Sequence, residues 1–321
     1  MTPPEALGPL GHAPLRRAGG VRRTSTLDMT WPDGFAGPLH VQGRARDVRT
    51  PARGGPPAEL AEDRVDVALH PHRVIADVRS SPPRPELAAL VGGRAGGGLR
   101  SRLAATVPAE RASGTPLYLL LDDLAGASLI ADLAKTRWPS NGADALRDPA
   151  SMAGVCIGFQ PGSSALRPGA APRPRPVTPL VHPDDPAGWH DLPDITEPST
   201  RRARRIDITL TDVLEIDAMF QDSTTVPEGG RVAVHEYRVR ATADPATGEL
   251  LTLVAEPRIL PYAECPLAVA NLDPLLGGSL DDLRAEVPRT LRGVHGCTHL
   301  NDALRALTDV RALARLLPGG R

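Results

Sequence analysis

Two cysteines and two histidines in the last third of the chain have side chains that can bind a transition metal. Cys297 and His299 stand two residues apart in VHGCTHLNDALRAL, His235 lies in RVAVHEYRVRAT, and Cys265 lies in PYAECPLAV. Thiolate sulfur and imidazole nitrogen bind zinc, and they also bind iron and iron–sulfur clusters. The four residues therefore predict a metal site that holds zinc, with iron or an iron–sulfur cluster as the alternative.

The same residues also allow metal-free nucleophilic catalysis. Cys297 stands at a predicted helix start, where free N–H groups favour a thiolate, and His299 or His235 could act as its base. Glu236, next to His235, is a candidate acid. A third interpretation is structural, because free cysteines are often buried in protein cores and a single inward histidine is often only hydrogen-bonded there.

Three classes of function follow from these interpretations. A metal ion with an open position could activate water or polarise a carbonyl group, as in a small-molecule hydrolase or lyase. The non-enzymatic alternative is a metal or iron–sulfur carrier with a transfer partner, or a structural interaction protein. An enzyme should have a pocket beside the ligands, whereas a carrier should have its ligands at an exposed edge.

Composition excludes some partners. The 37 basic and 38 acidic residues give a formal net charge of -1, which provides no attraction for nucleic acid or a membrane surface. No apolar run approaches the roughly 20 residues that span a bilayer, and the first residues do not resemble a signal peptide. Three scattered cysteines are too few for a disulfide framework. We expect a cytoplasmic protein.

The chain contains an internal duplication. RRTSTLDMT resembles RRARRIDITL, LHVQGRARDVRT resembles LEIDAMFQDSTT, and GGLRSRLAATVP resembles GGSLDDLRAEVP, in the same order and at a nearly constant offset. Each copy has strand patterns first and helix patterns second, which predicts an α+β fold. We expect two related units, each an antiparallel sheet with helices on one face, arranged as a pseudo-dimer within a monomer.

Four segments are expected from this organisation. They are a disordered N-terminus (1–20), a degenerate N-terminal repeat (21–138), a Pro-rich connection (139–200) and a C-terminal repeat with the candidate site (201–317). Within the connection, GVCIGFQPGSSAL and DDPAGWHDL are unlike a spacer. Their Cys156, Trp189 and His190 predict that parts of the connection fold back onto a repeat.

Comparison of the copies assigns the chemistry to the second. Cys297 aligns with Leu117, His299 with Leu119, Cys265 with Pro85, and His235 with Asp63. The first copy therefore lacks every thiol and imidazole of the candidate site. Asp47 and Asp222 align with each other, which favours a structural role for both.

The segments RRARRIDI, VHEYRVRA, LPYAECPLA and GCTHLNDALRAL, together with GVCIGFQPGSSAL, resemble the domain-of-unknown-function family 2889. The GCTHL ending is similar to that of an actinobacterial branch of this family. The family implies no reaction.

The order of HEYRVRA, LPYAECPLA and HGCTHLNDAL is also similar to the iron–sulfur scaffold proteins of the NifU type. This resemblance implies that His235 replaces the first cysteine ligand of those proteins and that Cys265 and Cys297 match the second and third. His295 or His299 would replace their histidine. A histidine in place of one thiolate favours a mononuclear site such as zinc over a transferable cluster.

Overall fold

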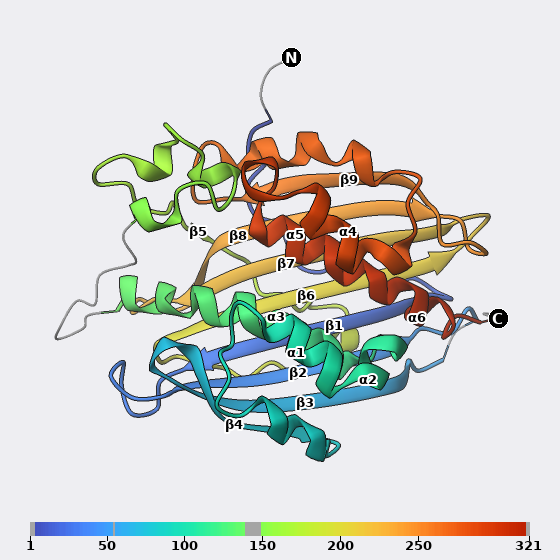
Figure 1. Ribbon diagram of the computed structural model, residues 1–321. Coiled ribbons are helices and arrows are strands. Elements are labelled where there is room, and N and C mark those ends of the chain that lie inside the picture. The colour runs from blue at the N-terminus through green and yellow to red at the C-terminus, as the bar shows by residue number, and fades with distance from the viewer. Residues whose placement is uncertain (1–3, 54, 139–148, 319–321) are drawn as a thin grey trace.

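The computed structural model describes residues 4–53, 55–138 and 149–318. Its centre is one antiparallel sheet with the strand order β4-β3-β2-β1-β6-β7-β8, and both β9 and the two-residue β5 pair with β8 (Figure 1). The strands are β1 (Val21–Thr30), β2 (Leu39–Arg49), β3 (Ala58–His70), β4 (Val74–Ser81), β5 (Arg175–Pro176), β6 (Ser199–Leu210), β7 (Leu214–Thr225), β8 (Arg231–Ala243) and β9 (Leu250–Ile259).

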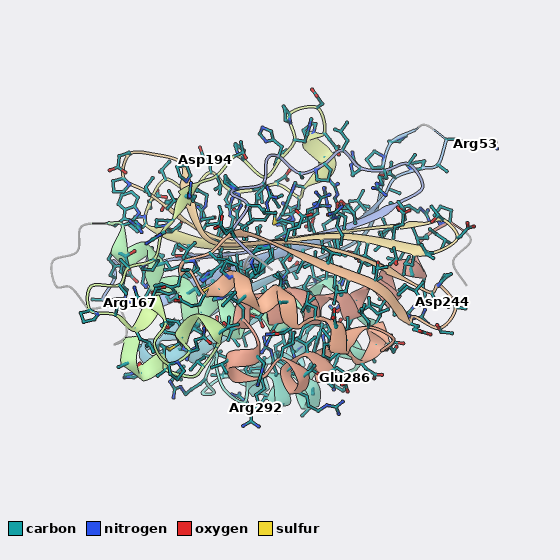
Figure 2. The ribbon with its side chains drawn as sticks, turned by 90° about the horizontal axis from the view of Figure 1, so that it is seen from above. Arg53, Arg167, Asp194, Asp244, Glu286 and Arg292 are labelled. Carbon is teal, nitrogen blue, oxygen red and sulfur yellow. The ribbon has the colours of Figure 1, made fainter. Side chains whose placement is uncertain are left out.

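The helices cover one face of this sheet, and loops cover the other (Figure 2). The α-helices are α1 (Leu99–Thr106), α2 (Pro108–Ser113), α3 (Pro116–Ile130), α4 (Leu283–Thr290), α5 (Thr298–Ala306) and α6 (Val310–Ala314). The predicted α+β class, with helices on one face of an antiparallel sheet, is confirmed. None of the helices in the described ranges has the length and hydropathy needed to cross a membrane.

The expectation of two separate sheets is wrong. The first strands of the two halves, β1 and β6, pair from Val21↔Ile208 to Thr30↔Ser199, so the halves form one continuous sheet. A separate sheet would leave the N–H and C=O groups of its first strand unpaired, and this pairing satisfies them. Each half still has its own apolar core between sheet and helices, one around Leu120 and Leu121 and the other around Leu300 and Leu304.

The predicted C-terminal helix is interrupted. Its apolar side chains, including Leu304 and Val310, are buried, but α5 ends at Ala306 and a 3-10 turn (Leu307–Asp309) separates it from α6. Asp309 lies in this turn, where it accepts hydrogen bonds from Arg284 and from Arg23 of the central sheet. A stripe of apolar residues indicates which face of a helix is buried, but it does not indicate where the helix is interrupted.

Loops from the N-terminus and the connection pack on the face opposite the helices. The N–H groups of Leu7 and Gly8 donate to carbonyls of β9, although the sequence predicts disorder there. The two ring nitrogens of His190 lie 2.9 Å from the hydroxyls of Thr24 and Thr26 in β1. Trp189 is buried beside it. The domain boundaries themselves stay a prediction.

Buried arginine–aspartate pairs fix the central strands. In the first half, Arg23 donates to both carboxylate oxygens of Asp47, at 2.6 and 2.7 Å, and in the second half Arg202 does the same to Asp222, at 2.8 and 3.0 Å. Arg204 of β6 joins the two halves, because it donates two hydrogen bonds to Asp123 of α3 in the first half. Each guanidinium is almost fully buried, and burying a charge is costly unless a partner offsets the cost.

The Asp123–Arg204 pair gives a direct test of this dependence. Asp123→Ala should lower the free energy of unfolding by at least about 3 kcal/mol, because it leaves the Arg204 charge buried without its carboxylate. The double variant Asp123→Leu, Arg204→Met should recover most of that loss, since it removes both charges. Chemical denaturation measures both, and a loss below about 1 kcal/mol in Asp123→Ala would contradict the dependence.

Candidate metal centre

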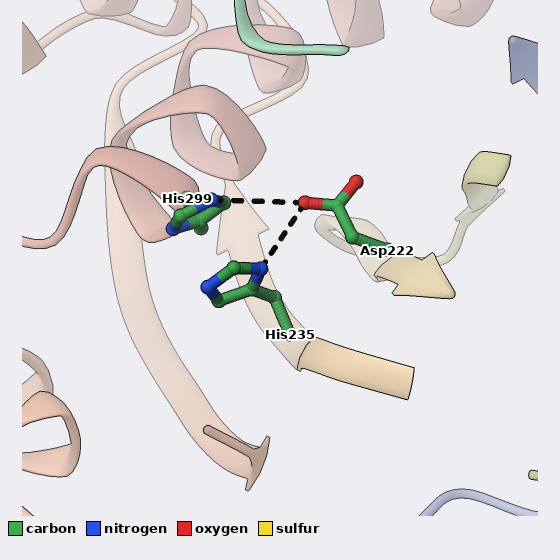
Figure 3. A group of neighbouring side chains, drawn as sticks. All are labelled: Asp222, His235 and His299. Atoms are coloured by element: carbon green, nitrogen blue, oxygen red, sulfur yellow. Dashed lines mark ion pairs between the residues drawn. The ribbon is translucent and has the colours of Figure 1, made fainter. Parts of the chain in front are cut away.

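Asp222, His235 and His299 converge on the helix-covered face of the sheet (Figure 3). Asp222 lies near the end of β7, directly opposite His235 of β8, at a β-bulge between Asp222 and Ser223. His299 is the second residue of α5, which begins after the extended backbone of Cys297. We call these three residues the Asp–His–His group.

Within the group, both imidazoles direct a nitrogen at one carboxylate oxygen. The Oδ2 atom of Asp222 lies 3.4 Å from His235 Nδ1 and 3.7 Å from His299 Nε2. The two imidazole rings are stacked, with centroids 3.4 Å apart and an interplanar angle of 15°. The Nδ1 atom of His235 is buried and has no hydrogen-bond partner of acceptable geometry, so it is a buried polar atom with unused bonding capacity.

The group is arranged to favour an ionised carboxylate and a neutral imidazole. Burial alone would raise the pKa of Asp222, but the adjacent charge of Arg202 holds that pKa well below its usual range. Burial, and then the neighbouring His235, lowers the pKa of His299 well below its ordinary value. A carboxylate and an unprotonated imidazole are the forms in which these side chains bind metals.

The structure brings together two of the four ligands predicted from the sequence. His235 and His299 belong to the Asp–His–His group, whereas Cys265 and Cys297 do not. The Sγ atom of Cys297 lies 3.9 Å from Nδ1 of His299, on the ring edge away from Asp222. Among the described residues, the Asp–His–His group is the set of side chains that could hold an ion, and it contains no cysteine.

The thiols gather instead beneath the connection. A Cβ atom on Gly158 would come within 2.7 Å of Cys265 Sγ and 3.7 Å of Cys156 Sγ, so only glycine fits here without a shift. The Ile157 N–H donates to the carbonyl of Gly296, next to Cys297. The segment GVCIGFQPGSSAL thus packs against the start of α5.

Burial keeps these thiols protonated. It raises the pKa of Cys297 to about 11, and the pKa of Cys265 is raised further by burial and by the neighbouring Cys297. With His299 held neutral, Cys297 and His299 do not form the thiolate–imidazolium pair of a cysteine nucleophile. These pKa shifts disfavour the cysteine nucleophile that the sequence allows.

Glu236, the third catalytic candidate, points to the other face of the sheet. Successive side chains of a strand alternate between faces, so Glu236 and His235 are separated by β8 itself. The carboxylate of Glu236 accepts hydrogen bonds from Gln221 and from the Leu10 N–H, both at 2.8 Å. This contact holds the N-terminal segment against the face of the sheet opposite the helices.

The sequence comparison of the two copies placed one residue wrongly and missed another. Asp47 is paired across the strands with Ala61 where Asp222 is paired with His235, so His235 corresponds to Ala61 and not to Asp63. Asp222 was assigned a structural role because Asp47 shares it. Its pairing with Arg202 confirms that role, but its position opposite His235 depends on the β-bulge after Asp222, and a direct count from the β7–β8 hairpin would place Val234 there instead.

The reactivity of the thiols distinguishes a buried from a nucleophilic cysteine. At pH 7.5 iodoacetamide should modify Cys156, Cys265 and Cys297 in the folded protein at least about 100-fold more slowly than free cysteine, because the reactive thiolate is scarce and inaccessible. All three should react in guanidinium chloride. Mass spectrometry of the peptides measures this, and fast labelling of Cys297 in the folded protein would restore the nucleophile interpretation.

Comparison with known proteins identifies the half that carries the group. Residues 200–313 match the family described as protein of unknown function (DUF2889). This range extends from β6 to α6 and includes the whole Asp–His–His group. No curated protein and no solved structure matches the chain. The predicted family is confirmed for this segment, whereas the actinobacterial branch and the likeness to NifU-type scaffolds find no support.

Proposed function

We propose that the segment matching DUF2889 binds one zinc ion through Asp222, His235 and His299, and that the ion fastens the start of α5 to β7 and β8. The observation that carries this proposal is the convergence of one carboxylate oxygen and two imidazole nitrogens from three separate elements, all within 4.8 Å of one another.

The spacing of the ligand atoms supports the proposal. Ligands that lie about 2.1 Å from a tetrahedral ion are separated from one another by about 3.4 Å. The separations of 3.4 and 3.7 Å from Asp222 Oδ2 to the two nitrogens match that edge. The unpartnered Nδ1 of His235 is the atom that a metal bond would satisfy.

Binding requires two local adjustments. The lone pairs of an imidazole lie in its ring plane, so two nearly parallel rings cannot direct both lone pairs at one ion, and the stacked rings must open. Arg202 Nη2 also donates to Oδ2, and that oxygen must turn from it to the ion. The Nε–Oδ1 hydrogen bond of 2.8 Å can persist and would orient the carboxylate from behind.

Burial favours zinc with a structural role over the other possibilities. A tetrahedral zinc ion needs one further ligand, whereas six-coordinate iron(II) needs three, and Asp222 is fully buried. Neither the cavity of about 240 Å³ under the N-terminal segment nor that of about 370 Å³ beside the β7–β8 hairpin is lined by the group. A hydrolase or lyase would need such a cavity, and a carrier would need exposed ligands.

Metal analysis with matched variants tests the proposal. Wild-type protein, stripped with a chelator, dialysed and reloaded with zinc, should retain about one ion per chain by mass spectrometry. Asp222→Asn, His235→Gln and His299→Gln should each weaken zinc binding by at least about 10-fold. Asp47→Asn is the matched control, because it breaks the equivalent arginine pair in the half that lacks the histidines.

Asp47→Asn should therefore bind zinc as the wild type does. Circular dichroism of each variant identifies any loss of folding. The proposal would be overturned if the reloaded wild-type protein retained no zinc. It would also be overturned if Asp222→Asn and Asp47→Asn bound zinc with equal affinity.

A further inference from the structure

Arg231, the first residue of β8, differs from the arginines of the central strands. Its guanidinium donates to the Ser223 hydroxyl at 3.1 Å, to the Ser199 hydroxyl at 3.2 Å and to the Ser223 carbonyl at 3.0 Å. All of these acceptors are neutral. Among the described residues, no carboxylate oxygen lies within 4.0 Å of a guanidinium nitrogen of Arg231. The hydrogen bonds therefore orient the guanidinium without neutralising its charge.

The surroundings leave one positive charge uncompensated. Arg201, the neighbouring cation, is paired with Asp28 at 2.5 Å and donates to the Pro193 carbonyl at 3.0 Å. This pair is neutral, and Arg231 adds a charge beside it. Burial, and then the charge of Arg201, lowers the pKa of Arg231 to about 9. A cation held in this way is a binding group for an anion.

The guanidinium borders a cavity large enough for a small molecule. The cavity has a volume of about 370 Å³ and is lined by Arg201, Arg231 and the apolar side chains Ile195, Val226 and Pro227. Asp194 and Glu228 also line it but do not pair with Arg231. Figure 2 places Asp194 on the face of the sheet opposite the helices. The Asp–His–His group lies on the helix-covered face (Figure 3).

We propose that this cavity binds a small molecule that carries a single carboxylate, with the carboxylate on Arg231 and an apolar body against Ile195, Val226 and Pro227. One uncompensated charge matches a monoanion better than a phosphate dianion. The planar guanidinium is suited to bidentate contact with a carboxylate, and Arg231 has N–H groups left on both terminal nitrogens. This site does not depend on the proposed zinc ion.

Calorimetric titration with sodium benzoate tests the proposal, with benzyl alcohol and inorganic phosphate as comparison ligands. Wild-type protein should bind benzoate, and binding of benzyl alcohol or phosphate should be at least about 10-fold weaker. Arg231→Gln should weaken benzoate binding by at least about 10-fold. Arg240→Gln is the control on the same strand, because its side chain is exposed and pairs with Glu256. It should bind as the wild type does.

Stability separates a binding arginine from a structural one. Without ligand, Arg231→Gln should unfold at the same temperature as the wild type or a higher one, because it removes an uncompensated charge, and benzoate should stabilise only proteins that retain Arg231. Absence of benzoate binding to the wild type, tighter binding of phosphate, or undiminished binding to Arg231→Gln would each overturn the proposal.

Discussion

The fold depends on the burial of arginine in its two central strands. Six guanidiniums of β1 and β6 are almost fully buried, and each has an aspartate partner: Arg22–Asp207, Arg23–Asp47, Arg201–Asp28, Arg202–Asp222, Arg204–Asp123 and Arg205–Asp217. Removing a charge from water costs free energy, and such partners offset that cost. The register of β1, β2, β6 and β7 is therefore constrained by ion pairs as well as by apolar packing. Helix α3, which supplies Asp123, and the 3-10 turn that supplies Asp309 are held against the same strands.

One pair in each half shows how the same scaffold acquires different chemistry. Asp47 faces Ala61 across β2 and β3, and Arg23 is its partner, so the carboxylate has a structural role alone. Asp222 has the same arginine partner, but it faces His235 across β7 and β8, and α5 adds His299. Two imidazoles make a structural carboxylate part of a group that could hold a metal ion. Arg202 then has two roles, since it stabilises the strands and orients the carboxylate.

Local features were predictable from the sequence, whereas contacts between distant segments were not. The strand patterns followed by helix patterns in each copy predicted the α+β class, because such patterns depend on neighbouring residues. The joining of β1 to β6 was not predicted, since strand-edge pairing leaves no local pattern. His235 and His299 were predicted as ligands from residue type and their absence in the first copy. Asp222 was missed for the opposite reason: its presence in both copies concealed its second role. Cys265 and Cys297 were predicted by type, but Cys265 packs at Gly158, and Cys297 lies on the edge of the His299 ring away from Asp222.

Anomalous diffraction at the zinc absorption edge, from crystals of protein reloaded with zinc, tests the account most directly. We expect one anomalous peak per chain about 2.1 Å from Asp222 Oδ2, His235 Nδ1 and His299 Nε2, with the two imidazole rings no longer parallel. A peak bound by Cys265 or Cys297 would contradict it. So would stacked rings with no anomalous peak between the three ligand atoms.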